Sequence, residues 1–306
     1  MRVPAVLVTL LALALPAAAQ EKIEIKSNVK KGLKFTKEQT FEGEGDCKLG
    51  GGEGGISLTF KVKLNGETKQ VEEINEAKSG MPVESRRQYP KRSSDVDMAM
   101  FGKQEDLAHP LEGAEITFGP SGKTAIGPDG AVPASALAGE EAADPLTMMV
   151  ASGKVVSAGN TWDADPERVK AWLTSEVPGL KAQEAEVSVK LAEFRDKDGQ
   201  KCVRLEIDGK AKGTFSTGKG PESPAELTIS GDVFYGIEAG MVISLKAKGE
   251  MKGTLPINTG GEEGNLEIKV PFQLKSSVKT GEAEFGAKPT AKPKPKKPEW
   301  YPPPVR

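Results

Sequence analysis

Hydrophobic and polar residues alternate with a period of two over long stretches of this chain. In residues 184–191, for example, the apolar side chains of Ala185, Val187, Val189 and Leu191 alternate with charged or polar ones. The same alternation recurs in residues 56–64, 203–208, 227–229, 241–248 and 266–274. Because successive side chains of a strand point to opposite faces, this pattern predicts strands with one dry and one wet face, as in antiparallel sheets.

Glycine-containing turn sequences separate or end these predicted strands. Asn-Gly and Asp-Gly pairs favour the positive φ angles of tight hairpins, and Gly-Pro-x-Gly segments favour four-residue turns. The predicted turns are Asn65-Gly66, Asp198-Gly199, Asp208-Gly209, Gly119–Gly122 and Gly127–Gly130. Pro271 lies inside the last strong strand pattern and predicts that this strand is at an edge or is bulged there, since proline lacks an N–H donor.

One helix has a clear sequence signature. Asp165-Pro166-Glu167 combines an acidic N-cap, proline at the first helical position and glutamate in the first turn. Apolar residues at helical spacing follow, including Trp172, and Pro178-Gly179 predicts the end. The Ala-rich stretch 134–150 predicts at most a weak second helix, interrupted near Pro145.

These elements predict a mainly β fold, with a large curved antiparallel sheet or incomplete barrel and one or two short helices on its concave side. Residues 20–287 are expected to form a single β-rich domain. Two subdomains that meet near 134–180 are the alternative, because the strand patterns form two groups on either side of the helical stretch.

The N-terminus resembles a secretory signal peptide. Arg2 precedes a short apolar run, and the small residues that end at Ala19 fit a cleavage site. The run of about ten residues is too short to cross a bilayer as a helix. We expect residues 1–19 to be removed, which leaves Gln20 first, and the product to be soluble and periplasmic or extracellular. A buried N-terminal helix is the alternative.

Export bears on the two cysteines, Cys47 and Cys202. In an oxidising compartment they could form a disulfide, which would stabilise the fold by about 5 kcal/mol in the chain-entropy model. Two free thiols are the alternative. One histidine and two cysteines leave too few ligands for a histidine-rich or thiolate-rich metal centre, and we expect no cofactor.

Charge is unevenly distributed along the chain. The tail 288–306 holds six basic residues and one acidic residue, so its net charge is +5. The body 20–287 holds 35 basic and 43 acidic residues, so its net charge is -8. The seven prolines of the tail favour an extended, unpacked conformation. The tail is either a tether to an anionic envelope polymer, a docking peptide or an end that keeps the protein soluble.

Three local sequences resemble functional sites, but each is better explained as ordinary surface or turn structure. Gly119–Thr124 ends like a phosphate-binding loop, but Thr117 stands where the first glycine is required. His109 lies beside a proline with no nucleophile near it, which is typical of a surface histidine. Arg86–Arg92 carries four positive charges, and we expect a solvated loop rather than a nucleic-acid patch.

A resemblance to a family rests on short sequence features. Val156 and Gly159-Asn160-Thr161-Trp162 fit a V-x-x-G-x-x-W step, Gly127–Val132 fits a D-G-x-V turn, and Tyr235–Gly240 fits a late turn into a strand pair. In these features the chain resembles an uncharacterised family of exported bacterial β-rich proteins. Such proteins resemble lipoprotein-carrier-like half barrels in outline, which implies an apolar cavity and no particular activity.

The function expected from the sequence is therefore binding without catalysis. Trp162 and Trp172 are the candidate cavity-lining residues, and the ligand would be an apolar small molecule, a partner segment or an envelope component. One alternative is an envelope scaffold tethered by the tail. Another is a hydrolase with an acidic site, since neighbouring carboxylates such as Glu140 and Glu141 are abundant.

Overall fold

The computed structural model describes residues 21–50, 58–98, 102–104, 109–137, 139–216, 222–259, 262–281 and 283–286. The expected signal peptide, its cleavage site between Ala19 and Gln20, and the tail 288–306 lie outside the described residues, so those expectations stay predictions. Within the described part of the chain, no helix is both long and apolar enough to cross a membrane.

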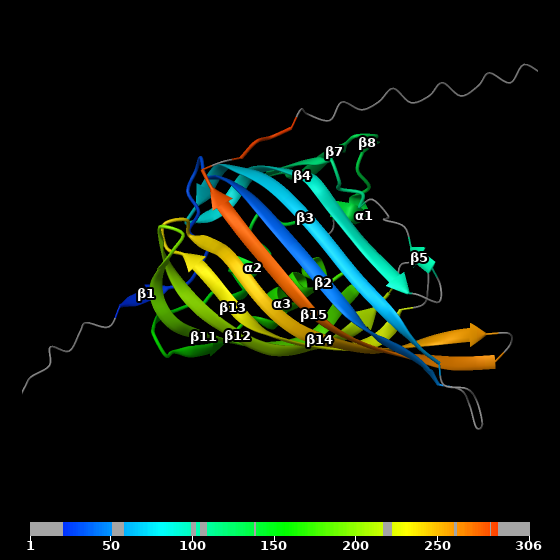
Figure 1. Ribbon diagram of the computed structural model, residues 1–306. Helices are drawn as coiled ribbons and strands as arrows, with labels where there is room; N and C mark the ends of the chain where they lie inside the picture. The colour runs from blue at the N-terminus through cyan, green and yellow to red at the C-terminus, as the bar shows by residue number, and fades with distance from the viewer. Residues whose placement is uncertain are drawn as a thin grey trace, which may run out of the picture.

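One antiparallel sheet of 13 strands dominates the structure (Figure 1). Its order is β10-β11-β12-β13-β14-β15-β2-β3-β4-β6-β7-β8, and β5 also pairs with β4. The long strands are β2 (Lys34–Gly50), β3 (Leu58–Lys78), β4 (Met81–Met98), β11 (Leu180–Lys197), β12 (Gln200–Phe215), β13 (Ser223–Gly236), β14 (Met241–Thr259) and β15 (Glu262–Thr280). The short ones are β5 (Gly102–Gln104), β6 (Glu115–Gly119), β7 (Gly122–Gly127), β8 (Gly130–Ala131) and β10 (Thr161–Asp163). Outside this sheet, β1 (Lys22–Glu24) pairs with β9 (Val155–Ser157).

The predicted fold class is confirmed. The two groups of strands in the sequence form one sheet because β15 pairs with β2 from Phe35↔Thr280 to Gly50↔Asn265. The order ends at β10 and β8, so the sheet is curved but does not close into a barrel.

The predicted alternation is also confirmed, and one row of paired residues shows how the sheet bends. This row crosses β11, β12, β13, β14, β15, β2 and β3 as Val187, Gly209, Ile229, Gly249, Phe272, Gly43 and Leu64. Large buried side chains alternate with glycines along it. A methyl group on Gly249 would lie 2.5 Å from the Phe272 ring, so the large side chains occupy the space that the glycines leave.

Two turn predictions are wrong, because Asp208-Gly209 and Asn65-Gly66 lie inside long strands. Gly209 belongs to the row above and permits close packing against β11, since a methyl group there would lie 2.4 Å from the Glu186 carbonyl oxygen. The reversal after β3 falls instead at Ser79-Gly80, where both residues have positive φ. Asp198-Gly199 is confirmed as the β11–β12 turn, and the two predicted four-residue turns connect β6, β7 and β8.

Pro271 does not mark an edge strand, because β15 lies between β14 and β2. Pro271 pairs with Glu250 on one side, while the ladder to β2 skips from Lys269 to Phe272. The strand therefore accommodates the missing N–H donor at a local gap in one ladder.

Three helices lie among the described residues, one more than the sequence predicts. They are α1 (Ala134–Leu137), α2 (Pro145–Met149) and α3 (Pro166–Glu176), and α2 and α3 lie on the inner face of the sheet (Figure 1). Pro145 begins α2 instead of interrupting a longer helix. The prediction for α3 is confirmed, since Asp165 is its N-cap and Pro166 its first residue.

Candidate functional site

The two tryptophans expected to line a cavity are packed in the main hydrophobic core. Trp162 on β10 is 8% exposed and Trp172 on α3 is fully buried, and both contact the apolar inner face of the β11–β15 half of the sheet. Neither lines the two surface depressions described below. At these positions the concave face is filled by Trp172 of α3 and Trp162 of β10, and their role in lining a cavity stays a prediction.

The expected disulfide between Cys47 and Cys202 is wrong, because both thiols are free and buried. Cys47 belongs to the main core and Cys202 to a smaller cluster around Phe35 and Ile74. Their strands, β2 and β12, are four positions apart in the sheet, which corresponds to about 19 Å at normal strand spacing. A disulfide needs a Cα separation of about 6 Å.

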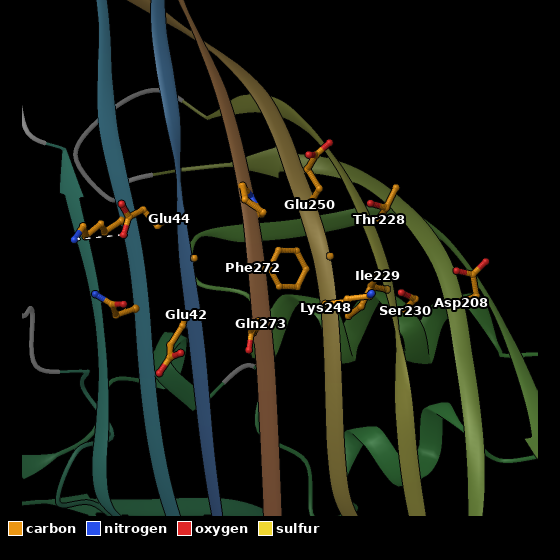
Figure 2. A pocket seen from close by; sticks show the side chains of 15 residues that line it. Glu42, Glu44, Asp208, Thr228, Ile229, Ser230, Lys248, Glu250, Phe272 and Gln273 are labelled. Atoms are coloured by element: carbon orange, nitrogen blue, oxygen red, sulfur yellow. Dashed lines mark ion pairs between the residues drawn. The ribbon is translucent and has the colours of Figure 1, made fainter.

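The first depression, here called the outer depression, has a volume of about 1000 Å³ on the solvent face of strands β12–β15, β2 and β3. Figure 2 shows that the carboxylates of Glu44, Asp208 and Glu250 lie apart on different strands and do not converge on one point. Glu44 pairs with Lys63 at 3.4 Å, and both side chains are about half exposed. This surface is wide and solvated, so its charges are strongly screened.

The second depression, here called the seam cleft, lies where the sheet fails to close. It has a volume of about 610 Å³ between α3, the start of β11 and the inner side of β2–β4. Its lining includes Gln39, Thr68, Arg92, Ser93, Ser94, His109, Glu140, Glu141, Glu167, Lys170, Thr174, Ser175, Glu176, Pro178 and Ala182. Strand β4 pairs with β6 over Ser85–Gln88 and with β5 over Val96–Met98, and the cleft opens between those two pairings.

Local sequence fixes the α3 wall of the seam cleft. The Asp165 carboxylate accepts a hydrogen bond from the Glu167 N–H at 2.9 Å, which satisfies a free donor of the first turn. At the other end, Gly179 adopts a φ of +75°, and a methyl group there would lie 2.4 Å from the Ser216 carbonyl oxygen. Only glycine fits this turn, and the turn places Pro178 near β3, where a methyl group added to Gly66 would lie 3.4 Å from the Pro178 ring.

A buried ionic network around Arg87 supports the β4 side of the cleft, whose lining includes the network residues Arg92 and Glu140. The Arg87 guanidinium donates to the carboxylates of Glu72 and Glu140 at 2.9 Å each and to the Glu141 carbonyl at 2.9 Å. Glu140 also accepts from Arg92 and from the Tyr89 hydroxyl, both at 2.5 Å. The side chains of Arg87 and Glu140 are 4% and 8% exposed, so these bonds hold the connection between α1 and α2 against β4.

A second buried group joins β2 to α2 and α3. The Lys37 ammonium lies 3.0 Å from an Asp144 carboxylate oxygen and 3.7 Å from Glu176, and its side chain is 8% exposed. Asp144 also caps α2 by accepting from the Thr147 N–H at 2.8 Å. Gln39 donates to the other oxygen of Glu176. The walls of the seam cleft are thereby connected through charged groups.

The pKa values of these groups follow from burial and neighbouring charge. Burial disfavours the ionised Glu140 carboxylate, but Arg87 and Arg92 outweigh it and lower the pKa of Glu140 to about 2. For Lys37 burial acts against the charged form, and the charges of Asp144 and Glu176 outweigh it and raise its pKa. Burial lowers the pKa of His109 to about 4, with a further contribution from Arg92.

The seam cleft has a net negative charge. Among its described lining residues, four are glutamates and two, Arg92 and Lys170, are cationic, while His109 is neutral at pH 7. Below them, Lys37 and Arg87 are balanced by Asp144 and Glu72. The formal charges of these groups sum to about -2, although Glu140, Glu167 and Glu176 are each paired with a cation, Glu167 with Lys170 at 2.6 Å.

Sequence reasoning missed most of this site. Arg86–Arg92 is not a solvated loop but part of β4, and its alternate residues Arg87 and Tyr89 turn to the buried face. His109 is half-buried at the cleft, where its Nδ1 accepts from the Leu111 N–H at 3.1 Å. The two-residue spacing of Arg87 and Tyr89 indicated that both side chains share one face of a strand, but nothing in the sequence indicated that Glu140 would contact them.

No family model matches the chain, and no curated protein matches its sequence. Among solved structures, the chain is similar to one titled "Lipid-protein interactions in lipovitellin", with 10% identity and a TM-score of 0.40. The alignment covers 85% of this chain and 26% of that chain, so this chain spans about a quarter of the length of its structural neighbour. The open curved sheet agrees with the half-barrel outline expected from the sequence, while membership of the exported bacterial family stays a prediction.

Proposed function

We propose that the protein is an exported, non-enzymatic binding protein, and that its seam cleft holds a polar, positively charged segment of a partner. The observation that carries this proposal is the half-enclosed cleft itself, with its excess of carboxylates between α3 and β4. A cationic segment gains attraction from these carboxylates, while an anionic one is repelled.

The buried ionic network supports binding because it fixes the cleft walls before a ligand arrives. Arg87 holds the α1–α2 connection to β4, and Lys37 holds β2 to Asp144 and Glu176. A preorganised site loses less conformational entropy when it binds. A partner segment is favoured over an apolar small molecule, since the apolar part of the concave face is occupied by α3 and its buried Trp172.

The protonation states of the cleft favour binding over hydrolysis. A general acid or base works best with a pKa near the operating pH. The pKa of Glu140 is lowered to about 2 and that of His109 to about 4, so both move away from neutrality. Glu140 is, in addition, fully engaged by Arg87, Arg92 and Tyr89.

A charged model peptide tests the binding site. We expect the full chain to bind a fluorescein-labelled peptide of six Lys-Pro repeats, measured by fluorescence polarisation at low salt, and not the matched Glu-Pro peptide. The double variant Glu141→Gln/Glu167→Gln should weaken binding about fivefold, which corresponds to roughly 1 kcal/mol for two rim charges. The control Glu42→Gln/Glu44→Gln, in the outer depression, should bind like the wild type. Equal binding of both peptides, or equal loss in both variants, would reject the site.

Export is tested separately by the mass of the protein recovered outside the cytoplasm. A mature chain that begins at Gln20 supports this part of the proposal. A full-length chain retained in the cytoplasm contradicts it without affecting the binding site.

A further inference from the structure

We infer that the occupant of the seam cleft is the chain's own basic tail, residues 288–306. This inference rests on the proposed binding site and names its ligand. The cleft and the tail have complementary charge, and the described chain ends against β4, the strand that provides one wall of the cleft.

The chain after β15 runs to β4 and reaches it on the face opposite Arg87 and Tyr89, because Arg86 and Gln88 alternate with those two residues along the strand. The Gly281 N–H donates to the Lys34 carbonyl at the start of β2 at 2.8 Å. The Phe285 ring then lies 4.4 Å from the guanidinium carbon of Arg86, and the Gly286 carbonyl accepts from the Gln88 amide at 3.5 Å. The chain has thus crossed from β15 past β2 and β3 to β4, the strand whose edge borders the cleft (Figure 1).

The remaining chain is long enough to reach and fill the cleft. From Gln88, Ser93 lies five residues along β4, or about 17 Å at strand spacing. Residues 287–306 would extend about 60 Å as a polyproline helix. The tail is therefore long enough to round the edge of β4 and place several of its residues in the cleft, whose volume is about 610 Å³.

The chemistry of the tail suits this cleft better than a new β-strand would. Its six basic residues and one acidic residue face a lining with four glutamates and two cations. Its seven prolines prevent a regular ladder with the edge of β4, so recognition would depend on charge and side-chain contact.

The outer depression is the competing location. Its carboxylates Glu42, Glu44, Asp208 and Glu250 lie on β2, β12 and β14, whereas the described chain ends at β4. They are also spread over an open face (Figure 2). These residues provide the internal control for the experiment.

Carbodiimide cross-linking of the full wild-type chain tests the inference without a mutation, because the reagent joins a lysine amine directly to a carboxylate in contact with it. Peptide mapping of the monomeric band should show links from Lys292, Lys294 or Lys297 to Glu141 or Glu167. The links should weaken at about 0.5 M salt, where the Debye length is only about 4 Å. Links to outer-depression carboxylates, or links found only between mixed light- and heavy-labelled chains, would overturn docking within one chain.

A binding comparison separates failure of this inference from failure of the proposed function. In a full-length variant whose five tail lysines are replaced by glutamine, the Lys-Pro peptide should bind about tenfold more tightly than in the wild type. This figure assumes an effective concentration of about 1 mM for the tethered tail and a tail affinity of about 0.1 mM. Equal binding in both chains, with no cross-links at the seam, would reject the tail as occupant while leaving the binding site intact. No binding in either chain, with no cross-links at the seam, would reject both.

Discussion

Replacing Arg87 by methionine removes the guanidinium that holds the α1–α2 connection to β4. Three hydrogen bonds disappear, two of them to carboxylates, and the side chain that makes them is only 4% exposed. Glu72 would keep only Gln70 among its recorded donors, and Glu140 would keep Arg92 and Tyr89. Methionine has a similar length, so the change removes charge and donors more than volume.

The loss of folding free energy on this substitution follows from the carboxylates that it leaves buried without their cationic partner. Breaking a buried ion pair by removing one partner typically costs about 3–5 kcal/mol, because the other charge stays buried without compensation. We expect about 3–4 kcal/mol for Arg87→Met, since Glu140 retains two partners. Lysine at this position keeps the charge but cannot reproduce three planar donors, so Arg87→Lys should lose about half as much.

Urea unfolding followed by far-ultraviolet circular dichroism measures this loss as a change in the free energy of unfolding. The matched control is Arg195→Met, because Arg195 is half exposed and its pair with Glu193 is solvated. The control should change the free energy by less than about 1 kcal/mol. A loss below about 1 kcal/mol for Arg87→Met, or an equal loss in the control, would refute the view that this network holds the cleft wall.

Four further predictions follow from the described contacts. The pKa of Glu140 is about 2 in the folded state, below its ordinary 4.5, so the stability that its carboxylate contributes is present above pH 4.5 and is lost as the pH falls toward 2. In acid-unfolding curves the wild type should therefore lose up to about 3 kcal/mol over this range relative to Glu140→Gln. Trp172→Ala should cost about 3–5 kcal/mol in urea unfolding and Trp172→Phe clearly less, since the buried indole N–H has no hydrogen-bond partner among the described residues. Cys47 and Cys202 should react with a thiol reagent only after denaturation, because both are buried and burial raises the pKa of Cys47 to about 11; a disulfide found by mass spectrometry would contradict this. Gly209→Ala should cost about 1–3 kcal/mol, measured the same way, because its methyl group would lie 2.4 Å from the Glu186 carbonyl oxygen.

The fold could be predicted from the sequence because the hydrophobic alternation that specifies its strands involves residues close together in the chain. The alternation in residues 184–191 and 266–274 assigns each side chain to a face, and Val187 and Leu274 are buried as expected. The same reasoning failed at Asp208-Gly209, where a pair that favours a turn lies within a strand. Its glycine is needed because a neighbouring strand packs closely there, and local sequence does not record that neighbour.

The candidate site was less predictable because its partners are distant in the sequence. Arg87 meets Glu140 across 53 positions, and Lys37 meets Asp144 across 107. Composition made both cysteines candidates for a disulfide, but only the strand order shows that β2 and β12 are far apart. Pairing between distant side chains follows from topology, which the hydrophobic pattern does not specify.

The open sheet itself accounts for the polarity of the seam. In a closed barrel the edge of β4 that faces away from β3 would pair with another strand along its whole length. Here that edge pairs only over Ser85–Gln88 and Val96–Met98, and the part between them faces a loop and a helix. A loop has backbone and side-chain polar groups that need partners when they are buried. Arg87 meets this need by binding both the Glu140 carboxylate and the Glu141 carbonyl, and Lys37 does so at Asp144. Side-chain ion pairs thus join this loop to β2 and β4 without replacing a strand ladder, since Arg87 itself pairs with Ile116 of β6. Carboxylates outnumber cations at the cleft lining, and this excess is the basis of the proposed binding of a basic segment.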